Sequence, residues 1–225
     1  MVNKESKELA KTKLKNLWTD ELNNLPKNSK HFETRLIPLN KVHPNVPSKK
    51  DCRPIAVSSA LVKLLESRLR RKLEDYMTHR LHRGQTGFVP NMGISVNQMR
   101  AISRIKEITN KNKHCYGLFI DYSSAYNTIL HSKLYEKLNN ILEQEEIQLL
   151  KALYSRNKIR LGTQHFTPNI GVAQGSVISP FLFNVYCEDM YKKIESEADI
   201  NYKDLLGYAD DLLVICTSPH QLKKL

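Results

Sequence analysis

Three aspartates in the second half of the chain are the residues best suited to chemistry. Asp121 ends the run CYGLFID, and Asp210 and Asp211 lie together between the apolar runs LLGY and LLVIC. A carboxylate in such surroundings loses hydration and neighbouring carboxylates repel each other, so we expect a bound cation to compensate. Oxygen ligands with no cysteine or histidine nearby favour a hard ion, Mg²⁺ or alternatively Mn²⁺, over Zn²⁺. Carboxylates on two strands can hold two such ions about 4 Å apart for in-line phosphoryl transfer.

Ordered motifs surround these aspartates. FIDYSSAY (119–126), AQGSVISPFLFN (173–184) and YADD (208–211) follow one another along the chain. They resemble motifs A, B and C of reverse transcriptases, above all those of non-LTR (LINE-type) retrotransposons, with group II intron enzymes as relatives. Upstream, DCRPIAVSSALVKLLESRL (51–69) resembles the fingers block of that family, and QTGF (85–88) resembles the block after it. YADD alone is a weak signal, but several motifs in this order are highly specific.

The resemblance implies a set of metal ligands. Asp121 matches the motif A ligand, and Asp210 and Asp211 match the motif C pair. In the family the backbone carbonyl after the first aspartate also touches a metal, and here that residue is Tyr122.

The resemblance also implies residues that bind the substrate. Tyr126 occupies the position whose ring excludes a ribose 2′-hydroxyl, although it could instead be an ordinary core tyrosine. Gln174 and Gly175 match the motif B pair, where a glycine lets the backbone approach the new base pair. Arg53 matches the arginine that grips the incoming triphosphate, with a surface salt bridge as the alternative. Lys41 lies two positions beyond the place of the family's upstream lysine, so its assignment is the least direct.

The elements that must position these residues follow from periodicity and turn signals. We expect strands over 34–41, 53–59 and 115–126, helices over 59–79, 95–110, 131–156 and 176–195, and hairpins over 158–172 and 205–216. Lys63 and Glu66 match fingers-helix positions with an architectural role, and Ser179-Pro180 marks a helix start. This order predicts an α+β fold: the fingers and palm of a right-hand polymerase, with an antiparallel palm sheet backed by helices and no thumb. The expected domains are a basic helical segment over 1–30, fingers over 31–113 and a palm over 114–225, truncated before a thumb.

Charge and composition narrow the partners. The 225 residues carry a net charge of +12, with +14 in residues 1–113 and −2 in residues 114–225. A basic lobe of this kind suits a polyanion, and the competing interpretation is a solubilising surface. No apolar run of membrane-spanning length is present, so we expect no membrane partner. Four separate cysteines favour reduced thiols in a cytosolic, nuclear or organelle-matrix protein. The compartment that we expect for this intracellular protein is the nucleus or an organelle matrix.

The function these observations favour is an RNA-directed DNA polymerase core. Its partners would be an RNA template, a DNA or RNA primer and a dNTP, together with a separately encoded thumb or a ribonucleoprotein. The alternative is a reverse-transcriptase-derived protein that is catalytically idle and binds RNA structurally. An RNA-dependent RNA polymerase is disfavoured by Ala125-Tyr126, because an RNA synthase needs a smaller or polar residue at the second position.

Overall fold

The computed structural model describes residues 32–48, 51–111 and 113–225. The predicted helical segment over 1–30 lies outside these residues. Along the chain, the elements are β1 (Glu33–Asn40), β2 (Cys52–Ser58), α2 (Ala60–His79), α3 (Ile94–Thr109), β3 (Tyr116–Asp121), the 3-10 helix η3 (Ala125–Thr128), α4 (His131–Leu138), α5 (Gln144–Arg156), β4 (Lys158–Leu161), β5 (Gln164–Phe166), α6 (Ser179–Ala198), η4 (Tyr202–Asp204), β6 (Leu205–Tyr208), β7 (Asp211–Cys216) and α7 (Pro219–Lys223).

A four-stranded sheet with the order β2-β1-β4-β5 forms one arm of the molecule. Strands β1 and β2 make an antiparallel hairpin whose register runs from Thr34 opposite Ser58 to Asn40 opposite Cys52. The short strand β4 then pairs in parallel with the start of β1. Residues 35, 37 and 39 lie opposite 57, 55 and 53, so these six side chains share one face of the hairpin, and most of that face is exposed.

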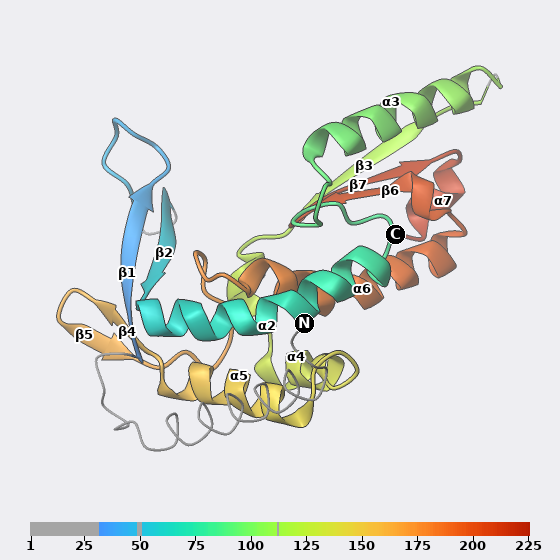
Figure 1. Ribbon diagram of the computed structural model, residues 1–225. Helices are drawn as coiled ribbons and strands as arrows, with labels where there is room; N and C mark the ends of the chain where they lie inside the picture. Colours follow the sequence, from blue (N-terminus) through green and yellow to red (C-terminus); the bar gives the residue numbers. More distant parts are fainter. Residues whose placement is uncertain (1–31, 49–50, 112) are drawn as a thin grey trace.

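A three-stranded antiparallel sheet with the order β3-β7-β6 forms the second arm. Strand β7 alternates strictly: Leu212 and Val214 belong to an apolar cluster with Tyr191 of α6, whereas Ile215 packs with Ile108 of α3. The alternation of a strand sends successive side chains to opposite faces. The sheet is therefore covered by α6 on one face and by α3 on the other (Figure 1).

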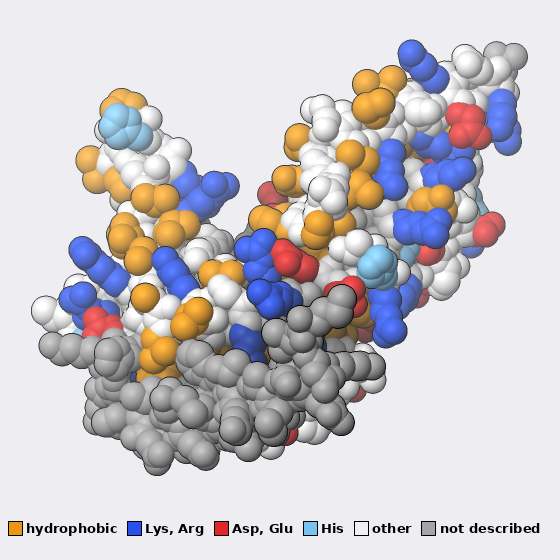
Figure 2. Space-filling model, in the orientation of Figure 1, with side chains coloured by type: hydrophobic (Ala, Val, Ile, Leu, Met, Phe, Trp, Pro, Cys, Tyr) orange, Lys and Arg blue, Asp and Glu red, His pale blue; other side chains and the backbone are white. Residues whose placement is uncertain are grey.

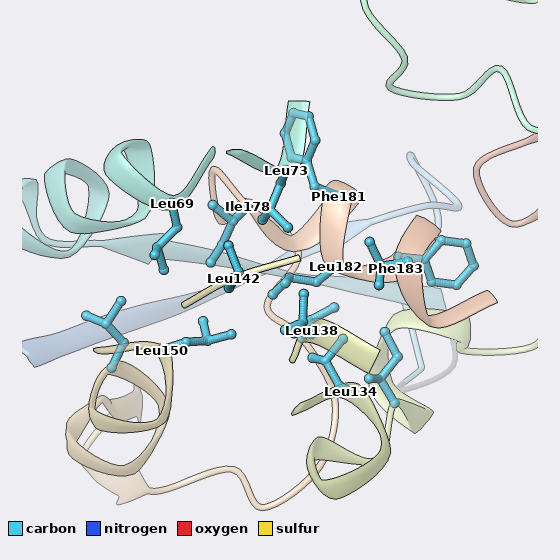
Figure 3. Close-up of a cluster of buried hydrophobic side chains, with 14 of the residues drawn as sticks. Leu69, Leu73, Leu134, Leu138, Leu142, Leu150, Ile178, Phe181, Leu182 and Phe183 are labelled. Atoms are coloured by element: carbon cyan, nitrogen blue, oxygen red, sulfur yellow. The ribbon is translucent and has the colours of Figure 1, made fainter. Parts of the chain in front are cut away.

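A helical core joins the two arms. Helix α2 is capped by Ser59, whose side chain accepts a hydrogen bond from the Val62 amide, and it buries one stripe of residues at helical spacing. Helix α6 begins at Ser179 with a proline in its first turn, as predicted. Figure 3 shows buried side chains of α2, α4, α5 and the α4–α5 connection packed against Ile178 and the first turn of α6: Leu69, Leu73, Leu134, Leu138, Leu142, Leu150, Ile178, Phe181, Leu182 and Phe183.

The single helix predicted over 131–156 is wrong, because two helices occupy that range. Helix α4 ends at Leu138, and α5 starts after Glu143 with a capping box in which Glu143 and Glu146 exchange hydrogen bonds with each other's backbone. Leu142 is buried in the connection, so the apolar period continues across the break and hides it from a pattern search.

Each of the two predicted domain segments contributes elements that pack with the other segment. Strands β4 and β5, from residues 114–225, complete the sheet of the β1–β2 hairpin. Helix α3, from residues 31–113, covers the sheet formed by β3, β7 and β6. The arm with the β1–β2 hairpin and the arm formed by the β3-β7-β6 sheet and α3 extend from opposite ends of the α2–α6 core (Figure 1). Figure 2 shows an open notch between the two arms. None of the helices in the described part of the chain is long and apolar enough to cross a bilayer.

Candidate active site

The register of the three-stranded sheet brings the aspartates together. Asp121 at the end of β3 lies directly opposite Asp211 at the start of β7, and Asp211 pairs in turn with Tyr208 of β6. Ala209 and Asp210 are the two residues of the turn that joins β6 to β7. Opposite residues of an antiparallel pair have Cβ atoms about 4.5–5.5 Å apart. The three aspartates therefore lie at the same end of the sheet, with Asp121 and Asp211 opposite each other and Asp210 in the adjoining turn.

The expected loss of hydration is wrong for two of these aspartates. Asp121 and Asp211 are exposed, and only Asp210 is partly buried. The apolar side chains of β3 and β7 lie further along the strands. The two aspartates are the terminal residues of these strands, at the open end of the sheet. Like-charge repulsion between opposite carboxylates remains as the feature that a cation would relieve.

The donor set suits a hard cation, because it contains carboxylate oxygens alone. Within the described residues, however, no group of three or more histidine, cysteine, aspartate or glutamate side chains is close enough to hold a metal ion. Two of the three aspartates are paired by the strand register, and the third projects from the turn. The chemistry of the ligands thus fits Mg²⁺, while the side chains do not form a closed cage.

Tyr126 lies near the end of the sheet that carries the three aspartates. Its ring stacks flat on Phe183 of α6, with centroids 4.9 Å apart and an interplanar angle of 3°. Burial, assisted by the negative charge of Asp210, raises the pKa of the Tyr126 hydroxyl well above its usual value. Burial likewise raises the pKa of the Cys187 thiol to about 12, with a smaller contribution from Asp210. Tyr126 and Cys187 are therefore neighbours of the turn aspartate, and both stay neutral near pH 7.

Gln174 and Gly175 connect the motif B loop to the β1–β2 hairpin. The Gln174 carbonyl accepts a hydrogen bond of 2.6 Å from the Ala56 amide at the free edge of β2. Gly175 has a φ of +103°, and a Cβ atom there would lie 2.6 Å from the Ala56 carbonyl oxygen. Both the backbone conformation and the available space therefore require glycine at this position.

The side chain of Glu66, on α2, forms hydrogen bonds with the same loop. The residue is 7% exposed, and its carboxylate accepts hydrogen bonds from the Ser176 hydroxyl at 2.8 Å and the Val177 amide at 2.9 Å. Burial raises the pKa of Glu66 above 4.5, although the two hydrogen bonds oppose that shift. Its place against the motif B loop agrees with the architectural role expected for it, whereas Lys63 is exposed on the same helix.

Arg53 and Lys41 lie on the exposed face of the β1–β2 hairpin. Arg53 pairs with Leu39, and the Lys41 amide continues the ladder by donating to the Asp51 carbonyl at 2.8 Å. Neither side chain forms a hydrogen bond or ion pair with Asp121, Asp210 or Asp211. The structure thus keeps these two cations on one arm and the carboxylates on the other.

The QTGF segment contains site residues to which the sequence assigned no role. The Gln85 side chain forms hydrogen bonds with both the amide and the carbonyl of Ala209, in the turn beside Asp210. Thr86 of the same segment and Asn97 of α3 donate to the carbonyl of Gly207, two residues before Ala209. The motif itself was recognisable from the sequence, but a contact across more than 120 residues was not.

The comparisons with known proteins agree with these features. A family model described as reverse transcriptase (RNA-dependent DNA polymerase) matches residues 7–225. A protein named "Probable RNA-directed DNA polymerase from transposon BS", from Drosophila melanogaster, is 28% identical, covering 76% of this chain and 20% of that protein. The Pol polyprotein of a type-1 retrotransposable element R2 from Popillia japonica is 28% identical over 72% of this chain and 24% of its own length. The RNA-directed DNA polymerase from mobile element jockey of Drosophila funebris is 24% identical over 74% of this chain and 19% of its own length.

Solved structures give the same fold. The telomerase from Candida tropicalis in complex with the TWJ fragment of telomeric RNA matches with a TM-score of 0.63 and 14% identity, over 95% of this chain and 40% of that one. The apo telomerase from Candida tropicalis truncated from the C-terminal domain gives a TM-score of 0.62 at 14% identity, over 93% of this chain and 49% of that one. This likeness confirms the predicted α+β fingers-and-palm fold, with an antiparallel palm sheet backed by helices. The chain spans a quarter or less of the length of the curated relatives reported above.

Proposed function

The chain belongs to the reverse transcriptase family, and on that premise we propose that it supplies the fingers and palm of an active RNA-directed DNA polymerase. One observation carries the proposal: Asp121 of motif A lies directly opposite Asp211 of motif C, and Asp210 occupies the adjoining turn. A structural RNA-binding protein has no need to keep like charges paired across two strands, since such pairs are destabilising.

The proposed cofactor is a pair of Mg²⁺ ions, with Mn²⁺ as the alternative. Asp121, Asp210, Asp211 and the main-chain carbonyl of Tyr122 would hold them. When bound, such ions supply Lewis-acid activation of the primer 3′-hydroxyl and charge neutralisation at the phosphates. The protein contributes the fixed register of β3 and β7, which keeps two of the carboxylates at adjacent strand positions.

The other site residues would bind and select the substrates. Arg53, exposed on the hairpin, would grip the triphosphate of the incoming dNTP in a bidentate manner, with Lys41 nearby at the tip. Tyr126 would lie against the sugar, since Phe183 fixes its ring in one plane. Gln174 and Gly175 would support the new base pair from the edge of β2.

The proposed partners are an RNA template, a DNA or RNA primer, and either a separately encoded thumb or a ribonucleoprotein. The open notch between the two arms is the place where a template-primer duplex would lie (Figure 2). The proposed compartment is the nucleus or an organelle matrix.

A second candidate function is that of an RT-derived protein that binds RNA without copying it. The observation that favours it is the lack of a closed three-ligand cluster within the described part of the chain. The two candidates differ in one measurable property, which is templated incorporation of nucleotides.

The test is primer extension on poly(rA)/oligo(dT) with Mg²⁺, using the natural full-length reading frame. We expect the wild type to incorporate dTTP, and Asp210→Asn and Asp211→Asn to fall to background while their melting temperatures stay equal or rise slightly, because a repulsive charge is removed. Asp75→Asn, the same change at an exposed site on α2, should keep full activity. An Asp210→Asn enzyme near the wild-type rate would contradict the metal-site assignment. A wild type that binds RNA but incorporates nothing with either Mg²⁺ or Mn²⁺ would replace the polymerase with the second candidate.

A further inference from the structure

The Gln85 side chain makes four hydrogen bonds around one turn. Its Nε2 donates to the Ala209 carbonyl at 2.9 Å and to the Tyr191 hydroxyl at 3.1 Å. Its Oε1 accepts from the Ala209 amide at 3.1 Å and from the Gly87 amide at 2.8 Å. A primary amide offers two donors and two acceptor sites, so every one of them is used here. Gln85 is only 4% exposed, and water therefore does not compete for these bonds.

Ala209 needs to be held, because its backbone has a φ of +57°. A left-handed conformation is unfavourable for a residue with a Cβ atom, because that atom then lies too close to the following carbonyl oxygen. Alanine has no polar side chain with which to stabilise that conformation locally. The amide of Gln85 bonds both the N–H and the C=O of this residue, and it can do so only while the turn keeps this orientation.

The surrounding contacts leave the turn little freedom. A Cβ atom on Gly87 would lie 2.2 Å from the Ala209 nitrogen, and one on Gly207 would lie 1.9 Å from the Tyr191 hydroxyl oxygen. The Gly207 amide donates to the Gly84 carbonyl at 2.7 Å, and its carbonyl accepts from the Thr86 amide at 2.9 Å. The segment 84–87 therefore lies beside β6, to which it is joined by an isolated parallel bridge between Gln85 and Gly207.

We propose that Gln85 is a positioning residue for phosphoryl transfer, which fixes the 208–211 turn so that Asp210 is presented next to Asp121. This inference rests on the polymerase function proposed above. An apolar side chain of equal length would fill the same space, so packing alone does not require glutamine. What requires it is the pairing with both backbone groups of the residue that precedes Asp210.

Amide hydrogen exchange tests the hydrogen bonds directly. In Gln85→Met the Ala209 amide loses its acceptor, and we expect its exchange to accelerate at least about tenfold while the amides of α6 are unchanged. Gln98→Met makes the same change at an exposed position of α3 and should leave the Ala209 amide as in the wild type. If Gln85→Met does not fold, Gln85→Asn is the second variant, because it keeps a primary amide but is one methylene shorter and cannot reach both backbone groups of Ala209, so the Ala209 amide should again exchange faster. Unchanged exchange at Ala209 in these variants would overturn the proposal.

Kinetics and metal binding separate positioning from simple stability. We expect Gln85→Met to lower the rate of incorporation per bound nucleotide about 10–100-fold with KM for the dNTP nearly unchanged, as for other residues that orient metal ligands. Mn²⁺ binding without nucleotide, followed by electron paramagnetic resonance, should weaken by a similar factor, and Gln98→Met should change neither. Faster exchange at Ala209 with a wild-type incorporation rate would overturn the positioning role. If the wild type incorporates nothing, the polymerase function fails, and Mn²⁺ affinity then decides: weakened binding in Gln85→Met supports the inference and unchanged binding overturns it.

Discussion

Tyr126 shows how packing can fix the plane of a selective side chain. The ring lies parallel to Phe183 and near Asp210, so it cannot turn without losing that stack. A rigid ring can reject a ribose 2′-hydroxyl by steric clash. Steric rejection in a rigid site can exceed the roughly 1–3 kcal/mol that a missing methylene costs.

The sugar selectivity of Tyr126 variants follows from this geometry. Tyr126→Ala should keep measurable dNTP incorporation and raise rNTP incorporation by at least about tenfold, because the space of the ring becomes free. Tyr126→Phe should behave as the wild type, since the ring rather than the hydroxyl group excludes the ribose. Incorporation of dTTP and UTP by the three proteins on the same template is the measurement. Unchanged selectivity in Tyr126→Ala would mean that Tyr126 is only a core residue.

Glu66 gives a prediction about pH. Because burial raises its pKa above 4.5, the folded state binds the proton more tightly than the unfolded state does. The contribution of Glu66 to stability is therefore fully present below pH 4.5 and is lost as the pH rises through the folded-state pKa. The free energy of unfolding of the wild type, measured by urea denaturation, should fall relative to that of Glu66→Gln as the pH is raised from about 4.5 to 8. Glu136→Gln, at an exposed site on α4, is the control. If the free energy of unfolding of the wild type fell by the same amount relative to Glu136→Gln over this pH range, burial of Glu66 would not be the cause.

At the scale of elements, the contact between the motif B loop and β2 links one arm to the core. Gly175→Ala introduces a Cβ atom 2.6 Å from the Ala56 carbonyl oxygen at a φ of +103°. We expect it to lower the free energy of unfolding by about 2–4 kcal/mol, since backbone strain and a steric clash add. Gly162→Ala, at a φ of +61° with open space around it, should cost only about 1–2 kcal/mol, because strain acts there without a clash. Equal losses in thermal or urea denaturation of the two variants would contradict the close approach.

The sequence predicted those elements whose signals are local. The apolar run LLVIC and the Ser179-Pro180 step each describe a single element, and β7 and α6 confirm them. The parallel pairing of β4 with β1 joins residues about 125 positions apart through a strand of four residues, which carries too little pattern to specify a partner. The Gln85 contacts were missed for a similar reason. The exposure of Asp121 was misjudged because burial depends on where a strand ends within its sheet, and the strand's own residues do not encode that.

At the scale of the whole molecule, charge and shape suit a duplex of nucleic acid. Arg35, Lys41 and Arg53 lie on the exposed face of the β1–β2 hairpin, and the carboxylates lie on the opposite arm, across the notch. Not all of the basic residues are available for a ligand. Lys72 of α2 pairs with Glu143 and Glu146 at the start of α5, and Arg70 pairs with Glu74. The hairpin face is therefore the better candidate for phosphate contacts than the basic stretch of α2.

Salt dependence measures how many phosphates the protein contacts. For the full-length protein and an RNA–DNA duplex, the logarithm of the association constant should fall against the logarithm of salt concentration with a slope between about −3 and −6, because counterions are released at each Lys or Arg contact. Lys41→Ala combined with Arg53→Ala should make that slope shallower by about 2, since each lost phosphate contact removes about one unit. Lys193→Ala removes a cation of α6 that pairs with Glu197 at 3.7 Å, so it should leave the slope unchanged and controls for the loss of net charge. Fluorescence anisotropy titrations across several salt concentrations give all three slopes. If the double variant keeps the wild-type slope, the phosphate contacts lie elsewhere than on the hairpin, and a slope near zero for the wild type would exclude a polyanion as the ligand of this face.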